Sequence, residues 1–212
     1  PDGGGQWRSW YRFFPWEDWR DGKPDMIEAE IIPRLSAWAD EAGVPGRRAS
    51  RHDRIKLVFG AGASGWNEES VLDRYELLYE AGLVEEAARD GHSDGAGPEL
   101  ALGSPMASDH RRILATAISR LRGKIKYRPV VFELMPEHFT LSHLQSVVEA
   151  VIGYRLHKQN FRRALDRTGF VEGTGKMESR TGGRPAELFR YRREALAGLP
   201  SLGLATPRLK EP

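Results

Sequence analysis

Gln159 and Arg163 are two side chains whose types and spacing together indicate a chemistry, the recognition of base pairs in DNA. A glutamine can form two hydrogen bonds with the major-groove edge of adenine, and an arginine can do the same with guanine. Four residues apart on a helix, the two side chains project from one face, whereas Phe161 and Leu165 fall on the opposite face. The spacing therefore predicts a helix over residues 157–168 whose exposed face reads bases in a major groove.

Basic side chains around this pair predict contacts with the DNA backbone. Arg162 and Arg167 flank the outward face, and arginines on phosphates position a protein without reading sequence. Asp166 also points outward, near the end of the helix, where we expect it to lie away from the groove floor. The complete set of residues predicted to bind DNA is Thr140, Ser142, Lys158, Gln159, Asn160, Arg162, Arg163, Arg167, Lys176, Arg180 and Arg184.

The elements around these residues follow the plan of a winged helix-turn-helix. Thr140 is placed to cap a helix that ends at Gly153, and a four-residue link leads to the helix that Gly169 closes. Two short strands, 170–171 and 188–191, then enclose a glycine-rich loop. The predicted wing carries three spaced cations: Lys176, Arg180 and Arg184. The alternative is a small helical domain with a solvated basic face.

Several elements are predicted upstream of this unit. The segment Trp7–Trp19 contains seven aromatic residues and reads as a strand and turn buried against a larger body, with an aromatic ligand cage as the alternative. The other expected elements, in chain order, are a helix at Pro33–Ala42, a basic loop at Arg47–Arg54, a strand at Ile55–Phe59, a helix capped by Asn67 and ending at Gly82, a linker at 90–108, a helix capped by Ser108 and stopping at Gly123, and an extended stretch at Tyr127–Leu134.

The charge of the chain is divided unevenly between its halves. Residues 1–108 contain 12 Lys and Arg against 20 Asp and Glu, a net charge of −8, whereas residues 109–212 contain 20 against 10, a net charge of +10. Such a reversal is typical of a chain in which one half binds nucleic acid. The chain has no cysteine and no apolar run of the roughly 18 residues that a membrane span needs. We therefore expect a cytoplasmic protein without disulfides or membrane contact, and the start at Pro1 indicates a processed or partial product.

Gly60–Gly65 has the spacing of the dinucleotide-binding motif G-x-G-x-x-G. Glu68 and Glu69 follow at the helix start that would have to receive the pyrophosphate, and two carboxylates there would repel it. The helix also starts late relative to the glycines, and no second βαβ unit follows. We therefore interpret Gly60–Gly65 as a loop.

Residues 22–44 nearly match the Nudix signature, in which glutamates on one helix face hold magnesium against a pyrophosphate. Ser36 and Ala37 replace the Arg–Glu pair of that signature, and Asp40 is one carbon shorter than the glutamate expected there. Pyrophosphate hydrolysis should therefore be poor or absent. The six histidines lack zinc spacing, and no nucleophile elbow frames a serine, so neither a catalytic nor a metal site is predicted.

Three segments of the second half resemble the C-terminal domain of the Nudix-related regulators of NAD metabolism: 139–145, 156–163 and 183–189. The segments 109–114 and 120–124 resemble the helix that leads into that domain. Phe14–Arg20 and Arg74–Leu83 resemble the alphaproteobacterial branch of the family, often called NadQ. The resemblance implies a dimeric DNA-binding repressor of NAD-biosynthesis or salvage genes, with a Nudix-like sensor of which this chain has only a part.

The residues and the resemblance together predict an α+β fold with two parts. Residues 1–108 would be a partial Nudix-like sensor domain with helical insertions, and residues 109–212 a connecting helix and a winged helix-turn-helix. The predicted function is repression of NAD-biosynthesis genes, with double-stranded DNA, a second copy of the chain and a nucleotide effector (ADP-ribose, NAD or ATP) as partners, and no cofactor. The alternatives are a Nudix hydrolase acting on a dinucleotide such as ADP-ribose, and a winged helix that serves protein contacts.

Overall fold

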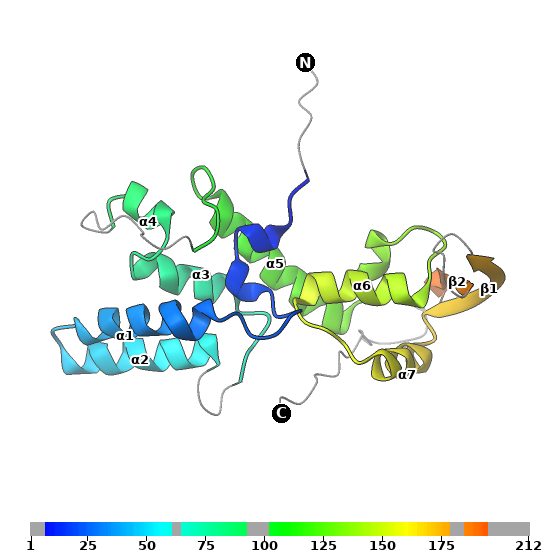
Figure 1. The fold of residues 1–212 in the computed structure, drawn as a ribbon, viewed down its shortest axis with the longest axis horizontal. Coiled ribbons are helices and arrows are strands. Elements are labelled where there is room, and N and C mark those ends of the chain that lie inside the picture. Colours follow the sequence, from blue (N-terminus) through cyan, green and yellow to red (C-terminus); the bar gives the residue numbers. More distant parts are fainter. Residues whose placement is uncertain (1–6, 61–64, 93–101, 179–184, 195–212) are drawn as a thin grey trace, which may run out of the picture. The chain divides into compact units, whose positions relative to one another are not determined.

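The computed structural model describes residues 7–60, 65–92, 102–178 and 185–194. The chain divides into two compact units, Pro1–Ser119 and Arg120–Pro212. Helix α5 (His110–Tyr127) begins in the first unit and ends in the second (Figure 1). Within the described ranges, no helix has both the length and the apolar character needed to cross a bilayer.

The first unit is built from helices in its described part. The elements before α5 are the 3-10 turns η1 (Trp10–Arg12) and η2 (Pro15–Glu17), the π-turn η3 (Ile27–Ile31), and the helices α1 (Ile32–Asp40), α2 (Pro45–Phe59), α3 (Val71–Glu80) and α4 (Glu85–Arg89). Helices α1 and α2 run side by side as an antiparallel pair (Figure 1). Both strands that the structure describes belong to the second unit.

Aromatic rings form the core of the first unit around a buried arginine. Phe14 lies edge-on to Trp16 and Tyr75, with ring centroids 5.9 and 6.1 Å away. The guanidinium carbon of Arg111 lies 5.5 Å from each of these three rings, and its Nη1 is 3.1 Å from Glu86 Oε2. Burial lowers the pKa of Arg111, an effect that Glu86 opposes. These rings therefore surround a side chain of the protein itself, not an empty ligand cage.

A second buried ion pair joins η2 to α3. Arg74 donates from Nε and Nη2 to the two oxygens of Glu17, at 2.5 and 2.9 Å, and both side chains are almost fully buried. Its Nη1 donates to the backbone carbonyls of Val58 and Asn67, and its guanidinium lies 3.7 Å from the ring of Trp66. The charge is thus surrounded by acceptors, which a buried ion pair requires for stability.

Residues 47–59 belong to one helix, α2, so the predicted basic loop and strand are wrong. Pro45 occupies the first turn of this helix, where its missing N–H is harmless, and Gly60 ends the helix with φ of 71°. Ile55 and Phe59 are buried, whereas Leu57 between them is 64% exposed. Burial at a spacing of four belongs to a helix, because a strand would have buried Leu57 as well.

The aromatic N-terminal segment is also helical where a strand was expected. Pro15 starts the 3-10 turn η2, and the backbone between Trp10 and Glu17 forms two such turns. The predicted helix at Pro33–Ala42 is confirmed as α1. Asn67 caps a short turn by accepting from the Glu69 amide at 3.0 Å, while α3 begins only at Val71.

Helix α5 continues through Gly123 to Tyr127, so the predicted stop at Gly123 is wrong. Arg122 is buried and donates from Nε to the carbonyl of Val151 at 2.9 Å, and Ile125 is fully buried. Packing on both sides of Gly123 outweighs the low helix propensity of glycine. The following stretch is not extended either, because η5 (Val130–Leu134) is a 3-10 helix.

The second unit places two helices before a two-stranded sheet (Figure 1). After η5 come α6 (Leu141–Ile152), α7 (Lys158–Thr168), β1 (Val171–Glu178) and β2 (Ala186–Tyr191). The strands are antiparallel, with Val171 opposite Tyr191. Phe139 extends the sheet through an isolated bridge to Phe189, with both backbone hydrogen bonds at 3.0 Å or less. This order of elements is that of a winged helix-turn-helix.

A compact core holds the second unit together. Tyr191 of β2 stacks on Phe132 of η5, with ring centroids 4.3 Å apart and planes within 10°. Leu144 and Val148 of α6 are fully buried. The remaining buried members of this core are Val131, Phe139, Ile152, Leu156, Phe161, Leu165 and Phe170. Because α7 contributes to this core, its orientation within the unit is fixed.

Candidate nucleic-acid interface

Helix α7 has the boundaries and the buried face that the sequence predicts. It begins after His157, whose backbone is extended, and ends at Gly169, which has φ of 61°. Phe161, Ala164 and Leu165 are its buried residues. The opposite face of α7 therefore points away from the core of the second unit.

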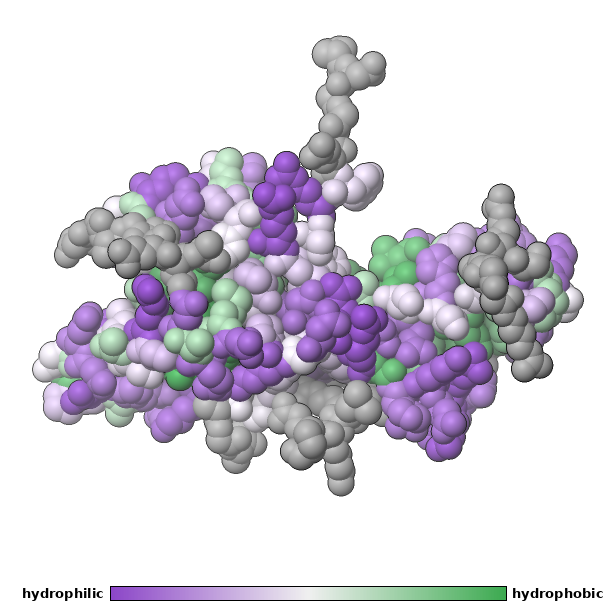
Figure 2. Space-filling model, in the orientation of Figure 1, coloured by the Kyte–Doolittle hydropathy of each residue, from purple (hydrophilic) through white to green (hydrophobic). Residues whose placement is uncertain are grey.

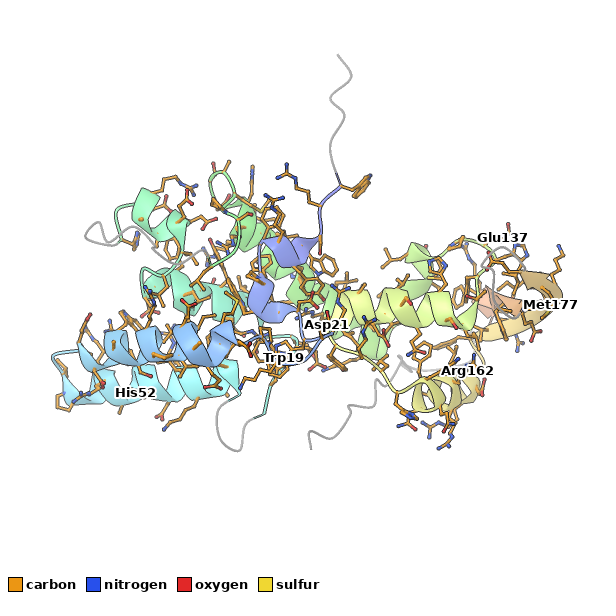
Figure 3. All side chains as sticks on the ribbon, viewed as in Figure 1. Trp19, Asp21, His52, Glu137, Arg162 and Met177 are labelled. Atoms are coloured by element: carbon orange, nitrogen blue, oxygen red, sulfur yellow. The ribbon has the colours of Figure 1, made fainter. Side chains whose placement is uncertain are left out.

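The exposed face of α7 carries a dense group of polar and basic side chains, which we call the α7 face. It consists of Lys158, Gln159, Asn160, Arg162, Arg163, Asp166 and Arg167, all exposed. Figure 2 shows hydrophilic residues over this helix, and in Figure 3 the labelled Arg162 projects from it. No ion pair joins the four cations of this face to any carboxylate of the described residues. Unpaired guanidinium groups are suited to bind phosphates and guanine edges.

A buried carboxylate sets the angle between α6 and α7. Glu149 Oε1 accepts from the backbone amide of Leu156 at 2.9 Å and from Nε2 of Gln145 at 2.8 Å, and Oε2 accepts from Arg155 at 3.1 Å. Gln145 also donates to the carbonyl of Leu156 at 2.9 Å. Burial raises the pKa of Glu149, but these hydrogen bonds outweigh burial and hold its pKa below the ordinary value. The turn is thus clamped by an ionised carboxylate.

Sequence reasoning missed this clamp. A signal for it exists, because Gln145 and Glu149 are four residues apart and Arg155 lies in the link that must turn back to them. The clamp explains how a short link can present α7 at a fixed orientation.

Thr140 and Ser142 lie at the start of α6. The hydroxyl of Thr140 accepts from the amide of His143 at 3.1 Å, which confirms the predicted cap. Ser142 is exposed, and its carbonyl accepts from the Ser146 hydroxyl. Thr140 is half-buried, so its cap role is the one that the structure describes.

Two arginines in the described part of the wing are paired with a carboxylate. Glu172 on β1 accepts from Arg190 at 2.5 Å and lies 3.6 Å from Arg192. Lys176 is exposed on β1, and the predicted contacts Arg180 and Arg184 lie outside the described residues. Unpaired cations in the described part of this unit are therefore more concentrated on α7 than on the sheet.

The described residues of the two nucleotide-like motifs in the first unit lack the features of a phosphate site. Gly60 follows a helix rather than a strand, contrary to the dinucleotide fingerprint. In the Nudix-like stretch, Glu28 pairs with Lys23, and Asp40 with Arg48. Among the described residues, no group of three or more metal-binding side chains is placed to hold an ion.

One cavity of about 380 Å³ opens in the first unit between α3, α4 and the start of α5. Burial, and next the Glu86 carboxylate, raise the pKa of Tyr75 to about 12, so this phenol stays neutral. Arg112 is the lone cation of the lining and pairs with Glu76 at 2.6 Å. The lining residues are Tyr75, Glu76, Tyr79, Glu86, Asp90, Ser108, Asp109 and Arg112. This excess of carboxylates disfavours a pyrophosphate.

Comparison with known proteins finds a family match within the second unit. Residues 131–191 match the family model described as the NrtR DNA-binding winged helix domain. Over 100 residues the chain is 39% identical to the ADPR responsive transcriptional repressor NtrR of Acinetobacter baylyi, covering 47% of this chain and 40% of that protein. The chain thus spans less than half the length of this curated relative.

Two solved structures are also similar to this chain. The crystal structure of Shewanella oneidensis NrtR complexed with a 27mer DNA is 29% identical, with a TM-score of 0.42, over 49% of this chain and 46% of that one. The crystal structure of Shewanella oneidensis NrtR is 31% identical, with a TM-score of 0.38, over 46% of this chain and 45% of that one. The family match over 131–191, together with the observed helices and sheet, confirms the predicted α+β class with a C-terminal winged helix-turn-helix.

Proposed function

We propose that this chain is a DNA-binding transcriptional repressor whose α7 face enters the major groove of its operator. The observation that carries the proposal is the α7 face itself: an exposed, unpaired Gln159 and Arg163 on the second helix of a winged helix-turn-helix. Such helices place their side chains against base edges. The similarity of residues 131–191 to the NrtR DNA-binding domain supports the same conclusion.

In this proposal each predicted contact has a place. Gln159 and Arg163 read bases, and Arg162 and Arg167 bind the flanking phosphates. Base recognition and phosphate binding are thereby assigned to different side chains of one helix. The further contacts, on α6, the first turn of α7 and the wing, are Thr140, Ser142, Lys158, Asn160, Lys176, Arg180 and Arg184.

The regulated genes are those of NAD biosynthesis, and the effector is a nucleotide. A relative 39% identical to this chain is an ADP-ribose-responsive repressor, which favours ADP-ribose over NAD or ATP. Residues 1–108 would be the later part of a Nudix-like sensor domain, and residues 109–212 the connecting helix and the DNA-binding domain. We assign the chain to the alphaproteobacterial NadQ-like branch on the segments Phe14–Arg20 and Arg74–Leu83. The protein would act in the cytoplasm as a homodimer, because two half-sites multiply the discrimination of one helix.

A gel-shift experiment tests this function directly. The chain should retard a duplex from the upstream region of the NAD-biosynthesis genes of its source organism, and ADP-ribose should release it. An Arg163→Ala variant should bind the duplex more weakly. An Asp53→Asn variant, which is changed on α2 of the first unit, should bind as the natural chain does. Retardation that is absent with every upstream duplex would reject the proposal.

The competing function is hydrolysis of ADP-ribose. Release of phosphate-containing products from ADP-ribose with magnesium, at a rate above that of a boiled sample, would support it. We expect no such turnover, because Ser36 and Ala37 stand where a hydrolase needs its Arg–Glu pair.

A further inference from the structure

Asp166 lies on the same side of α7 as the two predicted base readers. It follows Gln159 by seven residues and Arg163 by three, and these intervals return to one face of a helix with 3.6 residues per turn. The buried Phe161 and Leu165 fix which face this is. Asp166 is exposed there, so its carboxylate lies in line with Gln159 and Arg163.

The carboxylate of Asp166 does nothing for the helix that carries it. Three arginines are near it in sequence (Arg162, Arg163 and Arg167), yet no cation of the described residues forms an ion pair with it. It occupies the last turn before Gly169, where the helix dipole disfavours negative charge. An acidic residue that follows its basic neighbour by four positions is also in the weaker orientation for pairing. A structural role therefore does not account for this acid.

We infer that Asp166 is a specificity-determining residue of the α7 face, which accepts a hydrogen bond from the amino group of a cytosine and repels phosphate oxygens. The inference rests on the proposed DNA-binding function. In the major groove, the N4 amino group of cytosine is the donor that carboxylates accept. At 1.5 Å per residue, Asp166 stands about 10 Å from Gln159 along the helix, which spans about three base pairs.

This placement replaces the expectation that Asp166 lies away from the groove floor, and it requires α7 to lie along the groove rather than to enter it by its first turn alone. Recognition helices in that orientation read bases from positions spaced i, i+4 and i+7, as Gln159, Arg163 and Asp166 are. In a duplex without cytosine at the base pair opposite Asp166, the carboxylate has no amino group from which to accept a hydrogen bond. The acid lowers affinity for such DNA more than for a matched site, and discrimination between sites increases.

The test compares the whole chain with Asp166→Asn and Asp166→Glu on two probes. The first probe is a fixed duplex of arbitrary sequence. At low salt, Asp166→Asn should bind this duplex at least about threefold more tightly than the natural chain does. The second is a duplex pool randomised over its central base pairs, from which the natural chain should enrich cytosine at one position per half-site. That preference should vanish in Asp166→Asn and persist in Asp166→Glu, while the thermal midpoint of Asp166→Asn stays equal or rises.

Asp53→Asn is the matched control, because Asp53 is an exposed acid of α2 and its loss changes the net charge equally. Equal tightening by both asparagine variants would show a global charge effect and overturn the inference. Identical enriched sequences for the natural chain and Asp166→Asn would overturn it as well. Failure of the natural chain to bind any duplex would instead overturn the proposed function.

Discussion

The backbone amide of Leu156 donates to Glu149 Oε1 at 2.9 Å across the turn between α6 and α7. This bond fixes the start of α7 relative to α6 through a side chain that cannot contact DNA, because Glu149 is 5% exposed. The orientation of the α7 face therefore depends on a residue outside it.

Glu149→Ala should loosen this turn and weaken DNA binding. Leaving the Leu156 amide and Gln145 without their acceptor should cost about 1–3 kcal/mol. Hydrogen exchange of the amides at 153–158 measures the loss, and Glu137→Gln, an exposed acid before α6, is the control. Because all six tryptophans lie in residues 7–66, their fluorescence should stay unchanged. Exchange as slow as in the natural chain would contradict the clamp.

The stabilisation by Glu149 should depend on pH. The folded chain holds the pKa of Glu149 below 4.5, so its stabilisation is complete above the unfolded pKa and is lost as pH falls through the folded pKa. The stability difference between the natural chain and Glu149→Gln should be constant above about pH 5 and shrink in more acidic buffer. Exchange rates of the turn amides at a series of pH values check this. A difference that grows on acidification would reverse the assigned sign.

Arg163 and Arg167 should differ in what they contribute to DNA binding. Arg163→Ala should cost about 1–3 kcal/mol on the operator and relax the preference for one base per half-site. Arg167→Ala should weaken all duplexes by similar factors and lower the salt slope by about one. Titrations of an operator series with single base changes, at several salt concentrations, separate the two effects. A change of base preference in Arg167→Ala alone would reverse the roles.

Arg74 and Glu17 should be strongly coupled in the stability of the first unit. Arg74→Met removes the cation that pairs with the buried Glu17 carboxylate and should cost about 3–5 kcal/mol. The double variant Glu17→Gln, Arg74→Met should lose much less than the sum of the two single losses. Urea unfolding followed by tryptophan fluorescence measures both. Arg54→Met breaks an exposed pair with Glu80 and should cost less than about 1 kcal/mol. Additive losses for the buried pair would refute the coupling.

Gly60 should be far less tolerant of alanine than Gly65. Both have positive φ, 71° and 61°, so both variants carry the strain of an L residue there, about 1–2 kcal/mol. At Gly60 a Cβ would also lie 2.5 Å from the Gly65 carbonyl carbon, whereas at Gly65 no atom of the described residues lies within 4 Å of a Cβ. Fluorescence-monitored unfolding should therefore show a larger loss for Gly60→Ala. Equal losses of stability in the two variants would show that the backbone around Gly60 shifts to accommodate the Cβ without loss of stability.

Helices α6 and α7 were predictable because their signals are local. Thr140 and Gly169 mark helix ends through their own chemistry, and Phe161 with Leu165 fixes the buried face by spacing alone. No tertiary contact has to be known to place these features. The clamp at Glu149 was not predicted, because it depends on contacts between α6 and the link that follows it, which local helix signals do not reveal.

The predictions of secondary structure at Ile55–Phe59 and at Gly123 are both wrong. Ile55–Phe59 is a short apolar run, which by itself fits either a strand or a buried helix turn. Pro45, ten residues earlier, is the local signal for the start of the helix that contains this run. Gly123 looked like a helix end, but the buried Arg122 and Ile125 beside it carry α5 onward. Long-range contacts of this kind leave no mark in the neighbouring sequence.

Among the described residues, the outward side chains of α7 form no ion pair, while the inward side chains pack in the core of the second unit. Mutations at Gln159 or Arg163 are therefore free to accumulate without unfolding the domain, and the two sets of positions can evolve at different rates. Under the proposed function, a duplicated gene can change the sequence that its product recognises by single substitutions. The same separation makes a library randomised at the outward positions a practical source of regulators with new targets.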